Sequence, residues 1–528
     1  MEFQETGRQA YARLEPDREG YLCRARDASK LTLTYLIPPE GYDGTGLEEP
    51  FQSIGAEGVT TLAGKLLLAH FPPGNSFVRM VVDDYSMEQL KKDYGEQKAE
   101  QIRTEAAQSL LDMENAGVQE IETSGIRPKL DEMIKHHLVA GNVLVKVPET
   151  SDQNLQLWGL DQYVVERDDE DNLLLCVLKR SIAVQALQED LRALVLAEDK
   201  TKKDSKASAI DVYTVIARRE DASWEVWSEL SVGPKGYRMG EIKKYKDADD
   251  LPWRPLRMFP VDGEAYGHGF IPLHFGSLNY AEQVREALMS AGAAMSKLLI
   301  GIRNGSPTRA KDIQDAKNLD VIRMNEEDVW ILSFADKIPD LRYMSEEYNS
   351  VKQALERAFL MTTSIQRNAE RVTAREWEIL AQELESGLAG AYSQFASDFS
   401  QWFVSHTIAR MQREGRAPKF PPEIKVKPLI VTGIDALGRG KDVQALQSWF
   451  RFLAETMGPD AAAQIIHKDE LAKRAGALFG VKTASLLKTE EELAQEAQDA
   501  QLQSIAQTLG PEVAKLATQP QGGPTRRV

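Results

Sequence analysis

Polar and basic side chains are concentrated in one short stretch of this chain, QRNAER at 366–371, and a further arginine follows at position 375. Guanidinium groups bind phosphate oxygens well because their planar N–H fork matches the geometry of the anion. We therefore consider Gln366, Arg367, Asn368, Arg371 and Arg375 as candidates for contacting a nucleic-acid backbone without performing chemistry on it. Composition alone favours a plainer interpretation, a solvated loop between two helices.

The segment GVTTLAGK at 58–65 resembles a phosphate-binding loop. Such a loop has four residues between its glycines and a Ser or Thr directly after its lysine, where the hydroxyl holds Mg²⁺. Here five residues separate Gly58 from Gly64, and Leu66 follows Lys65. The stretch also lies within an apolar pattern of helical spacing, so the sequence does not support ATPase activity.

Other apparent motifs fail on their spacing. GRGKDV at 438–443 lacks the third glycine of a dinucleotide fingerprint, and DDEDN at 168–172 lacks the ligand spacing of a calcium loop and predicts a hairpin turn. His136 and His137 are adjacent, so on a helix they diverge by about 100° and cannot easily share a metal. No HExxH, GxSxG or paired-cysteine pattern occurs. We expect no catalytic residue, no metal and no cofactor.

The charge balance limits which partners are plausible. The chain has 528 residues, a formal net charge of −17 and a pI near 5.1. This acidity counts against tight nucleic-acid binding, because neutralising phosphates is what creates affinity. It is compatible with a protein along which DNA slides, although −17 also fits the simpler role of keeping a large protein in solution.

Composition also bears on compartment. Hydrophobic residues make up 42% and charged residues 27%, the ordinary range for soluble proteins of two to four packed regions. No apolar run is long enough for a membrane span, and the charged first twenty residues do not resemble a secretory signal. Cys23 and Cys176 form no metal or disulfide pattern, which favours a reducing, cytoplasmic setting.

Two helices are expected to position the basic stretch. Ser345 can cap a helix that carries Val351, Leu355 and Phe359 and loses its pattern near 362–364. Thr373 and Glu376 fit a capping box, which predicts a second helix from there to about residue 413. Its apolar residues recur every three or four positions over roughly 60 Å, and glycines at 387 and 390 indicate a bend.

The rest of the chain reads as an α+β body followed by helices, predominantly helical overall. Expected helices lie at 3–35, 54–67, 87–123, 127–140 and 183–198, and expected strands at 77–80, 143–147, 163–180 (a hairpin), 210–219, 223–230 and 253–261. A helix rich in small residues is expected at 278–302, and 303–344 reads as a protruding strand-and-turn insertion. A strand is expected at 424–433 and helices from 435, before a disordered tail at 519–528.

Several collinear segments resemble the portal proteins (head-to-tail connectors) of short-tailed, autographivirus-type phages. They are FQSIGAEGVTTLAGKLLLAHFP at 51–72, LVAGNVLVKVPE at 138–149, YVVERDDEDNLL at 163–174, IDVYT at 210–214, RMFPVDGEAYGHGFI at 257–271, QRNAERVTAREWEILAQELESGLAGAYS at 366–393 and VTGIDALGRGKD at 431–442. Together they span most of residues 1–445, whereas the last eighty residues match weakly.

The resemblance implies a portal fold assembled as a ring of about twelve subunits. The implied order is wing (1–276), first stem helix (277–302), clip (303–344), second stem helix (345–364), tunnel loop (365–373), long wing helix and return (374–429), and crown with a C-terminal helical extension (430–528). It places the polar stretch in the DNA channel. It also places Arg309, Lys311, Asp312 and Trp330 in the clip, where partners dock.

The implied function is to pass double-stranded DNA through a unique capsid vertex during packaging and ejection. The implied partners are further copies of the chain, transiently bound DNA, the terminase large subunit, major capsid and scaffolding proteins, and tail adaptor and internal core proteins. The protein would be assembled in the host cytoplasm, reside in the virion and have no ATPase activity of its own.

Two rival functions remain to be weighed. A DNA-stimulated motor or nuclease needs a nucleotide loop or an acidic metal cluster, and the sequence offers neither. A capsid or scaffold-interaction protein without a DNA channel would bury its arginine stretch between subunits. Images of the purified protein would distinguish this last alternative from a ring.

Overall fold

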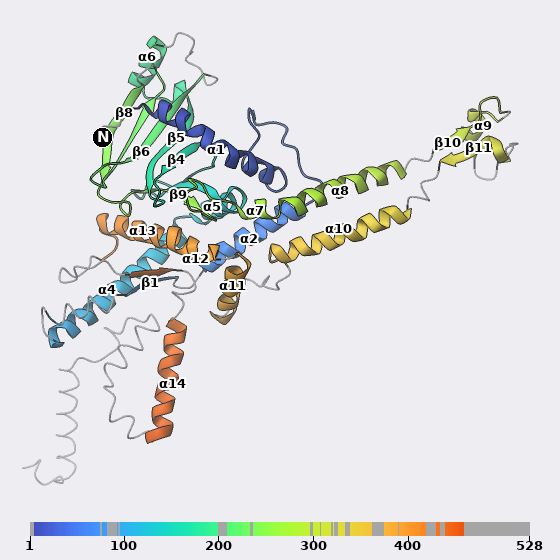
Figure 1. The fold of residues 1–528 in the computed structure, drawn as a ribbon. Helices are drawn as coiled ribbons and strands as arrows, with labels where there is room; N and C mark the ends of the chain where they lie inside the picture. Colours follow the sequence, from blue (N-terminus) through green and yellow to red (C-terminus); the bar gives the residue numbers. More distant parts are fainter. Residues whose placement is uncertain are drawn as a thin grey trace, which may run out of the picture. The chain divides into compact units, whose positions relative to one another are not determined.

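The computed structural model describes most of the chain up to residue 458 (Figure 1). The described residues are 5–73, 77–81, 92, 96–198, 208–232, 236–295, 299–306, 308–317, 320–321, 326–332, 338–361, 374–388, 390–418, 429–432 and 439–458. They divide into two compact units, residues 1–99 with 112–437 and residues 100–111 with 438–528. The predicted C-terminal extension beyond 458 and tail lie outside the described residues.

A five-stranded antiparallel sheet forms one layer of the first unit. Its strands, in spatial order, are β4 (Tyr163–Arg167), β5 (Leu173–Ala183), β6 (Ala209–Arg218), β7 (Trp224–Leu230) and β8 (Tyr237–Tyr245). The register pairs Val177 with Val215 and Val215 with Trp227, so alternate side chains point to one face. The predicted hairpin and the predicted strand pair are confirmed. Strand β8 was not predicted because it is a largely exposed edge strand with few apolar residues.

Helix α1 (Gly7–Lys30) covers the inward face of this sheet. Its residues Ala10, Tyr11 and Leu14 are buried against strand residues from β4 to β7. A capping box at Thr6 and Gln9 starts the helix, because each side chain accepts from the other residue's backbone N–H. The helix predicted over 3–35 is therefore confirmed with shorter ends.

A second, three-stranded sheet adjoins helices of the same unit. Its strand order is β3 (Gln156–Trp158), β2 (Asn142–Lys146) and β9 (Trp253–Arg257). Helix α5 (Arg127–Ala140) contacts α1, α2 (Ile54–His70), α7 (Phe270–Leu273) and both β2 and β3. The predicted helix at 127–140 is confirmed, and Gly141 ends it with a left-handed φ of 72°.

The long helix predicted from 373 to 413 is wrong as a single element. The structure has α11 (Ala374–Gly387), α12 (Ala391–Phe395), a π-helical turn η5 (Ala396–Ser400) and α13 (Gln401–Arg413). Gly390 adopts φ 86° and interrupts the helix where a bend was expected. Beyond the break, Phe399 and Phe403 stack with ring centroids 5.3 Å apart and pack against Phe71.

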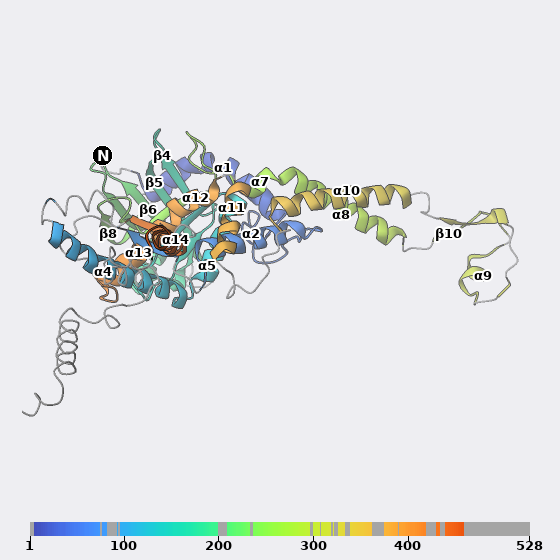
Figure 2. The same ribbon diagram turned by 90° about the horizontal axis from the view of Figure 1, so that it is seen from below.

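Helices α8 (Phe275–Met295) and α10 (Ile338–Ala358) lie side by side (Figure 1 and Figure 2). Between them in sequence come β10 (Leu299–Ile302), α9 (Ala310–Gln314), the 3₁₀ turn η2 (Glu326–Asp328) and β11 (Val329–Leu332). The helix predicted to 302 is wrong at its end, since residues 299–302 are a strand paired antiparallel with β11. The helix predicted to begin at Ser345 begins seven residues earlier, so Ser345 lies inside it and not at its N-cap.

The remaining described elements connect distant parts of the sequence. They are β1 (Val78–Val81), α4 (Glu96–Thr123), the 3₁₀ turn η1 (Val184–Ala186), α6 (Glu189–Glu198), β12 (Leu429–Thr432) and α14 (Arg439–Met457). Strands β1 and β12 pair antiparallel across about 350 residues of sequence. Among the described helices, none is both long and apolar enough to cross a membrane.

Candidate DNA-channel segment and the elements that hold it

The predicted channel residues fall in a segment whose two ends the structure describes. Gln366, Arg367, Asn368 and Arg371 lie at 362–373, outside the described residues. Arg375 lies in the first turn of α11, which begins at position 374, directly after the predicted N-cap. The chain enters this segment at the C-terminus of α10 and leaves it into α11.

The entry to the segment is a strained helix cap. Met361 N–H donates to the Glu356 carbonyl at 2.8 Å, and Leu360 N–H donates to the Arg357 carbonyl at 3.1 Å. This pair of bonds is the Schellman arrangement that ends many helices, with its left-handed residue at Leu360, φ 55°. Glycine is usual there, because a left-handed backbone costs other residues about 1–2 kcal/mol. Surrounding contacts must therefore hold Leu360 in place.

Those contacts come from α2, from α7 and from His274, the residue that follows α7. The Lys65 Nζ on α2 donates to the Leu360 carbonyl. Phe359 is completely buried, with its ring against Phe270 and His274 at centroid distances of 6.0 and 5.9 Å. The residues immediately before the predicted channel segment are thus anchored to the body.

The segment that resembled a phosphate-binding loop has a different structure. Gly58 to Lys65 lies entirely within α2, whereas a phosphate-binding loop precedes its helix and presents free N–H groups. The sequence-based rejection is confirmed. Of GRGKDV at 438–443, residues 439–443 form the start of α14 and position 438 lies outside the described residues.

The acidic turn at 168–172 is a hairpin turn, as predicted. Asp168 Oδ1 accepts from the backbone N–H of Glu170 at 3.1 Å and of Asn172 at 2.7 Å. The Asp171 carboxylate pairs with Arg257. The Asp168 carboxylate thus holds the turn together, and the Asp171 carboxylate joins the turn to Arg257.

The adjacent histidines are core residues of α5. Burial lowers the pKa of His136 to about 4 and of His137 to about 3, so both are neutral near pH 7. His137 lies against Phe395 with ring centroids 5.5 Å apart. Within the described part of the chain, no three His, Cys, Asp or Glu side chains converge as metal ligands.

The predicted clip residues lie on two different elements. Trp330 on β11 faces Gly301 of β10 in the register and is 49% exposed. A Cβ at Gly301 would lie 2.3 Å from the indole, so only glycine admits the ring there. Arg309 and Lys311 are exposed at the start of α9. Asp312 also lies in α9, but its side chain is not among the described side chains. Sequence reasoning missed Gly301, because residues 299–302 were predicted to be helical and the glycine opposite Trp330 appears only once they pair as a strand.

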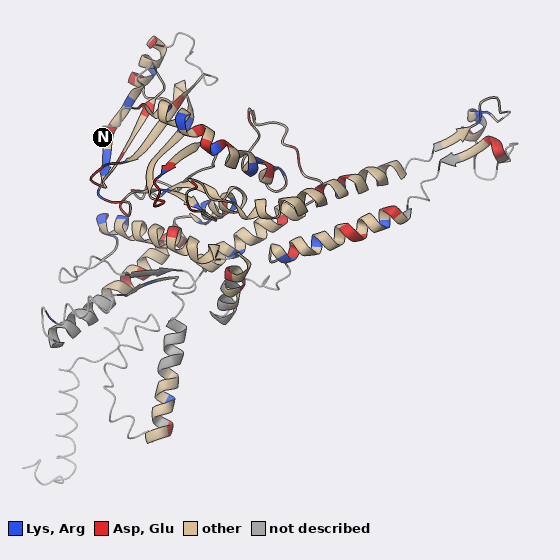
Figure 3. Ribbon diagram, viewed as in Figure 1, with Lys and Arg blue, Asp and Glu red and all other residues tan. Residues whose placement is uncertain are grey.

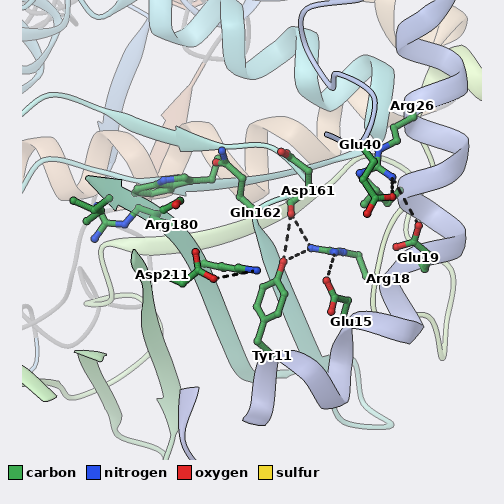
Figure 4. A pocket seen from close by; sticks show the side chains of 15 residues that line it. Tyr11, Glu15, Arg18, Glu19, Arg26, Glu40, Asp161, Gln162, Arg180 and Asp211 are labelled. Carbon is green, nitrogen blue, oxygen red and sulfur yellow. Dashed lines mark hydrogen bonds and ion pairs between the residues drawn. The ribbon is translucent and has the colours of Figure 1, made fainter. Parts of the chain in front are cut away.

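A polar pocket of about 530 Å³ lies between α1 and the five-stranded sheet (Figure 4). Arg18 Nη1 donates to the Tyr11 hydroxyl at 2.6 Å and to the Asp161 carbonyl at 2.9 Å. Lys179 pairs with Asp211 at 3.4 Å. The side chains that line the pocket thus bind one another, and they join α1 to the sheet. Sequence reasoning missed this network, although Tyr11 and Arg18 stand two helical turns apart, on one face.

Comparison with known proteins gives a consistent family. The family model of the bacteriophage head to tail connecting protein matches residues 4–487. The portal protein of Escherichia phage T7 is 31% identical over 492 residues, covering 91% of this chain and 88% of its own length. The portal protein of Enterobacteria phage SP6 is 30% identical over 493 residues, covering 93% and 91%.

Among solved structures, a chain from the neck of an empty GTA particle covers 86% of this chain and 94% of its own. Its identity of 12% and TM-score of 0.36 are too low to support an argument. The family model carries the assignment, because it extends from residue 4 past the end of α14, and each of the two portal proteins covers more than nine-tenths of the chain. This chain therefore belongs to the family of bacteriophage head to tail connecting proteins, as do the portal proteins it resembles.

Proposed function

We propose that the chain assembles into a ring of about twelve identical subunits at one capsid vertex and conducts double-stranded DNA along the ring axis. The role is structural. Movement of the DNA would be driven by the terminase large subunit docked on the ring. Tail adaptor proteins would replace it later, while major capsid, scaffolding and internal core proteins contact the ring elsewhere in the virion.

The exposed apolar surface of the α8–α10 pair is the observation that best supports a ring. Tyr280, Met289 and Met295 on α8 are 40%, 50% and 38% exposed, and Tyr343 on α10 is 68% exposed. Aromatic and methionine side chains are enriched in protein–protein interfaces relative to the rest of a protein's surface. Identical neighbours in a ring would cover them, because each subunit offers the same surface again.

The corrected boundaries refine the proposed subdomains. The stem would consist of α8 and α10, and the clip would run from 299 to 337. The tunnel loop would follow α10, and the body from 1 to 274 together with α11–α13 would form the wing. Residues from 430 onward would form the crown and its extension.

Charge patterning is consistent with DNA moving past this surface. Acidic side chains on α10 alternate with basic ones, whereas α8 carries few charges (Figure 3). Acidic walls repel phosphates, and a few arginines per subunit give weak contacts that the ring repeats. Such contacts would guide DNA without holding it.

Replacing Arg367 and Arg371 together with alanine is expected to leave rings intact and to reduce packaged, nuclease-protected DNA about tenfold. Each lost arginine removes a phosphate contact, and the ring multiplies the loss. The measurement is packaging with the variant as the sole portal. Arg8 and Arg24, two exposed arginines of α1, provide the matched double replacement, which should package normally. Normal packaging by the 367/371 variant would overturn the channel role, and loss of rings would place these arginines between subunits.

Trp330→Ala is expected to weaken docking of terminase or the tail adaptor about tenfold or more, because tryptophan is enriched among the residues that carry most of the binding energy in interfaces. The measurement is a pull-down with purified partner and assembled rings. Tyr237→Ala, which removes a 44% exposed aromatic from the edge strand β8, is the control. Unchanged docking by Trp330→Ala would show that the clip does not bind through this residue.

A further inference from the structure

Helix α2 contacts both helices that flank the predicted tunnel loop. It packs against α10, which enters the loop, and against α11, which leaves it. These two contacts come from separate parts of the sequence, about 300 residues beyond α2. A residue on α2 can therefore act on both ends of the loop at once.

Lys65 lies at this meeting point. Its side chain is largely buried, with 9% of the residue exposed, and Nζ donates to the Leu360 carbonyl. Burial lowers the pKa of Lys65, while the Glu383 carboxylate on α11 acts in the opposite direction. The ammonium thus binds the last turn of α10, while α2 itself packs against α11, the helix that carries Glu383.

Gly58 lies two turns earlier on the same face of α2. A Cβ at this position would lie 2.5 Å from the Phe359 ring, so a side chain there would displace Phe359. Two of the three residues that gave the segment its likeness to a phosphate-binding loop therefore have another role. Gly58 leaves room for the Phe359 ring, and Lys65 binds the carbonyl of Leu360, the residue that follows Phe359.

The strained Leu360 completes the arrangement. Glycine would adopt φ 55° without strain, but it would lack the side chain that lies against Gly387 at the end of α11. A Cβ at Gly387 would be 3.3 Å from Leu360 Cδ1, which shows how closely the two chain segments approach. The leucine thus joins the loop entry to α11 through its side chain and to α2 through its carbonyl.

We propose that Lys65 is a positioning residue that holds both ends of the tunnel loop, 362–373, at a fixed separation: it binds the Leu360 carbonyl of the entry turn and attracts the Glu383 carboxylate of α11, a helix on which α2 also packs. This inference rests on the proposed function, in which that loop meets DNA. The gain is preorganisation, because a loop whose ends are fixed loses less entropy when it contacts a ligand. The lysine itself does not touch DNA.

Lys65→Met keeps the length and packing of the side chain and removes its charge and donors. We expect amide hydrogen exchange at Leu360 and Met361 in assembled rings to accelerate about tenfold, the size expected from one hydrogen bond to a charged group. Exchange in α5 should not change. Packaged DNA should fall severalfold, while ring formation is retained.

Two further variants keep the test decisive. Lys30→Met removes a 67% exposed lysine side chain that pairs with Glu48 at the surface, and it should match wild type in both measurements. Glu383→Gln removes the α11 partner and leaves Lys65 in place, so it should accelerate exchange at the same two amides even if Lys65→Met does not assemble.

The outcomes separate this inference from the proposed function. Unchanged exchange at Leu360 and Met361 in both Lys65→Met and Glu383→Gln would overturn the positioning role, whatever the arginine variants do. Faster exchange with normal packaging would also overturn it, since the loop would then work without the restraint. Normal packaging by the 367/371 double variant would instead refute the channel role and leave the exchange result standing.

Discussion

Valine at position 141 is expected to prevent the body from folding. Gly141 ends α5 with φ 72°, a region that a β-branched residue enters only with strain. A Cβ there would lie 2.3 Å from the His268 carbonyl carbon and 2.4 Å from the Gly269 nitrogen. Backbone atoms cannot move aside as a flexible side chain could. We expect a loss of more than about 4 kcal/mol, a large part of a domain's stability.

The surroundings of Gly141 explain why the backbone could not easily shift to make room for a side chain at this position. The Gly141 carbonyl accepts from Met258 N–H at 2.8 Å, and the Asn142 side chain bonds both polar backbone groups of Gly267. Gly269 in turn faces the Val139 carbonyl, where a Cβ would be 2.6 Å away. Two backbone segments far apart in sequence therefore meet without intervening side chains.

The measurement is the soluble yield and the urea unfolding midpoint of Gly141→Val. Gly20→Ala is the control, since Gly20 lies inside α1 with no described atom within 4 Å of an added Cβ. That replacement should be neutral or stabilising by up to about 1 kcal/mol. A Gly141→Val protein that unfolds at the wild-type urea concentration would refute the close approach.

Mild acid is expected to destabilise the body steeply through three buried histidines. Burial lowers the pKa of His70 and His137 to about 3 and of His136 to about 4, from an ordinary 6.5. His70 also stacks on Tyr392 with ring centroids 4.3 Å apart, and its charged form would have to form among aromatic rings. The folded state therefore holds these side chains neutral.

The sign of the effect follows from proton binding. Below pH 6.5 the unfolded chain protonates these histidines, whereas the folded chain does not until about pH 4 or 3. The free energy of unfolding must therefore fall as the pH falls through this range. Between pH 7.5 and 5 each histidine contributes a loss of about 2 kcal/mol, so the three together contribute about 6 kcal/mol.

Urea unfolding at pH 7.5 and pH 5, with the assembly state held constant, measures this difference. His137→Phe should reduce the pH-dependent loss by about one third, even if it changes stability at both pH values. Equal unfolding free energies at the two pH values in the wild-type chain would show that the histidines are not held neutral by burial.

Local patterns predicted most of the body. The helix at 127–140 and the strand pairs of the five-stranded sheet were predicted because apolar spacing and turn residues agree there. The hairpin turn at 168–172 was predicted for the same reason. The close approach of Gly141 to residues 267–269 was not predictable, because it depends on which distant segments meet.

The helix ends show where local reasoning fails. Ser345 is a good N-cap residue, yet α10 begins at Ile338, since helical residues further upstream extend it. Residues 299–302 continue an apolar pattern that also fits a helix, and pairing with β11 makes them a strand. Gly390 interrupts the predicted long helix because its backbone is left-handed, which a sequence shows only as a glycine.

The helices that flank the polar stretch are confirmed, whereas the role of the stretch itself stays a prediction. Lys65 was set aside with a false motif. Its contact with Leu360 spans 295 positions in sequence, so no local pattern could reveal it.

Single-particle electron microscopy of the purified chain can show directly whether it forms a DNA-conducting ring. We expect closed rings of identical subunits, about twelve, with a central channel and with residues 362–373 of every subunit facing it. Particles that remain monomeric or dimeric under all assembly conditions, or rings whose centre is closed by the body, would contradict a DNA-conducting portal.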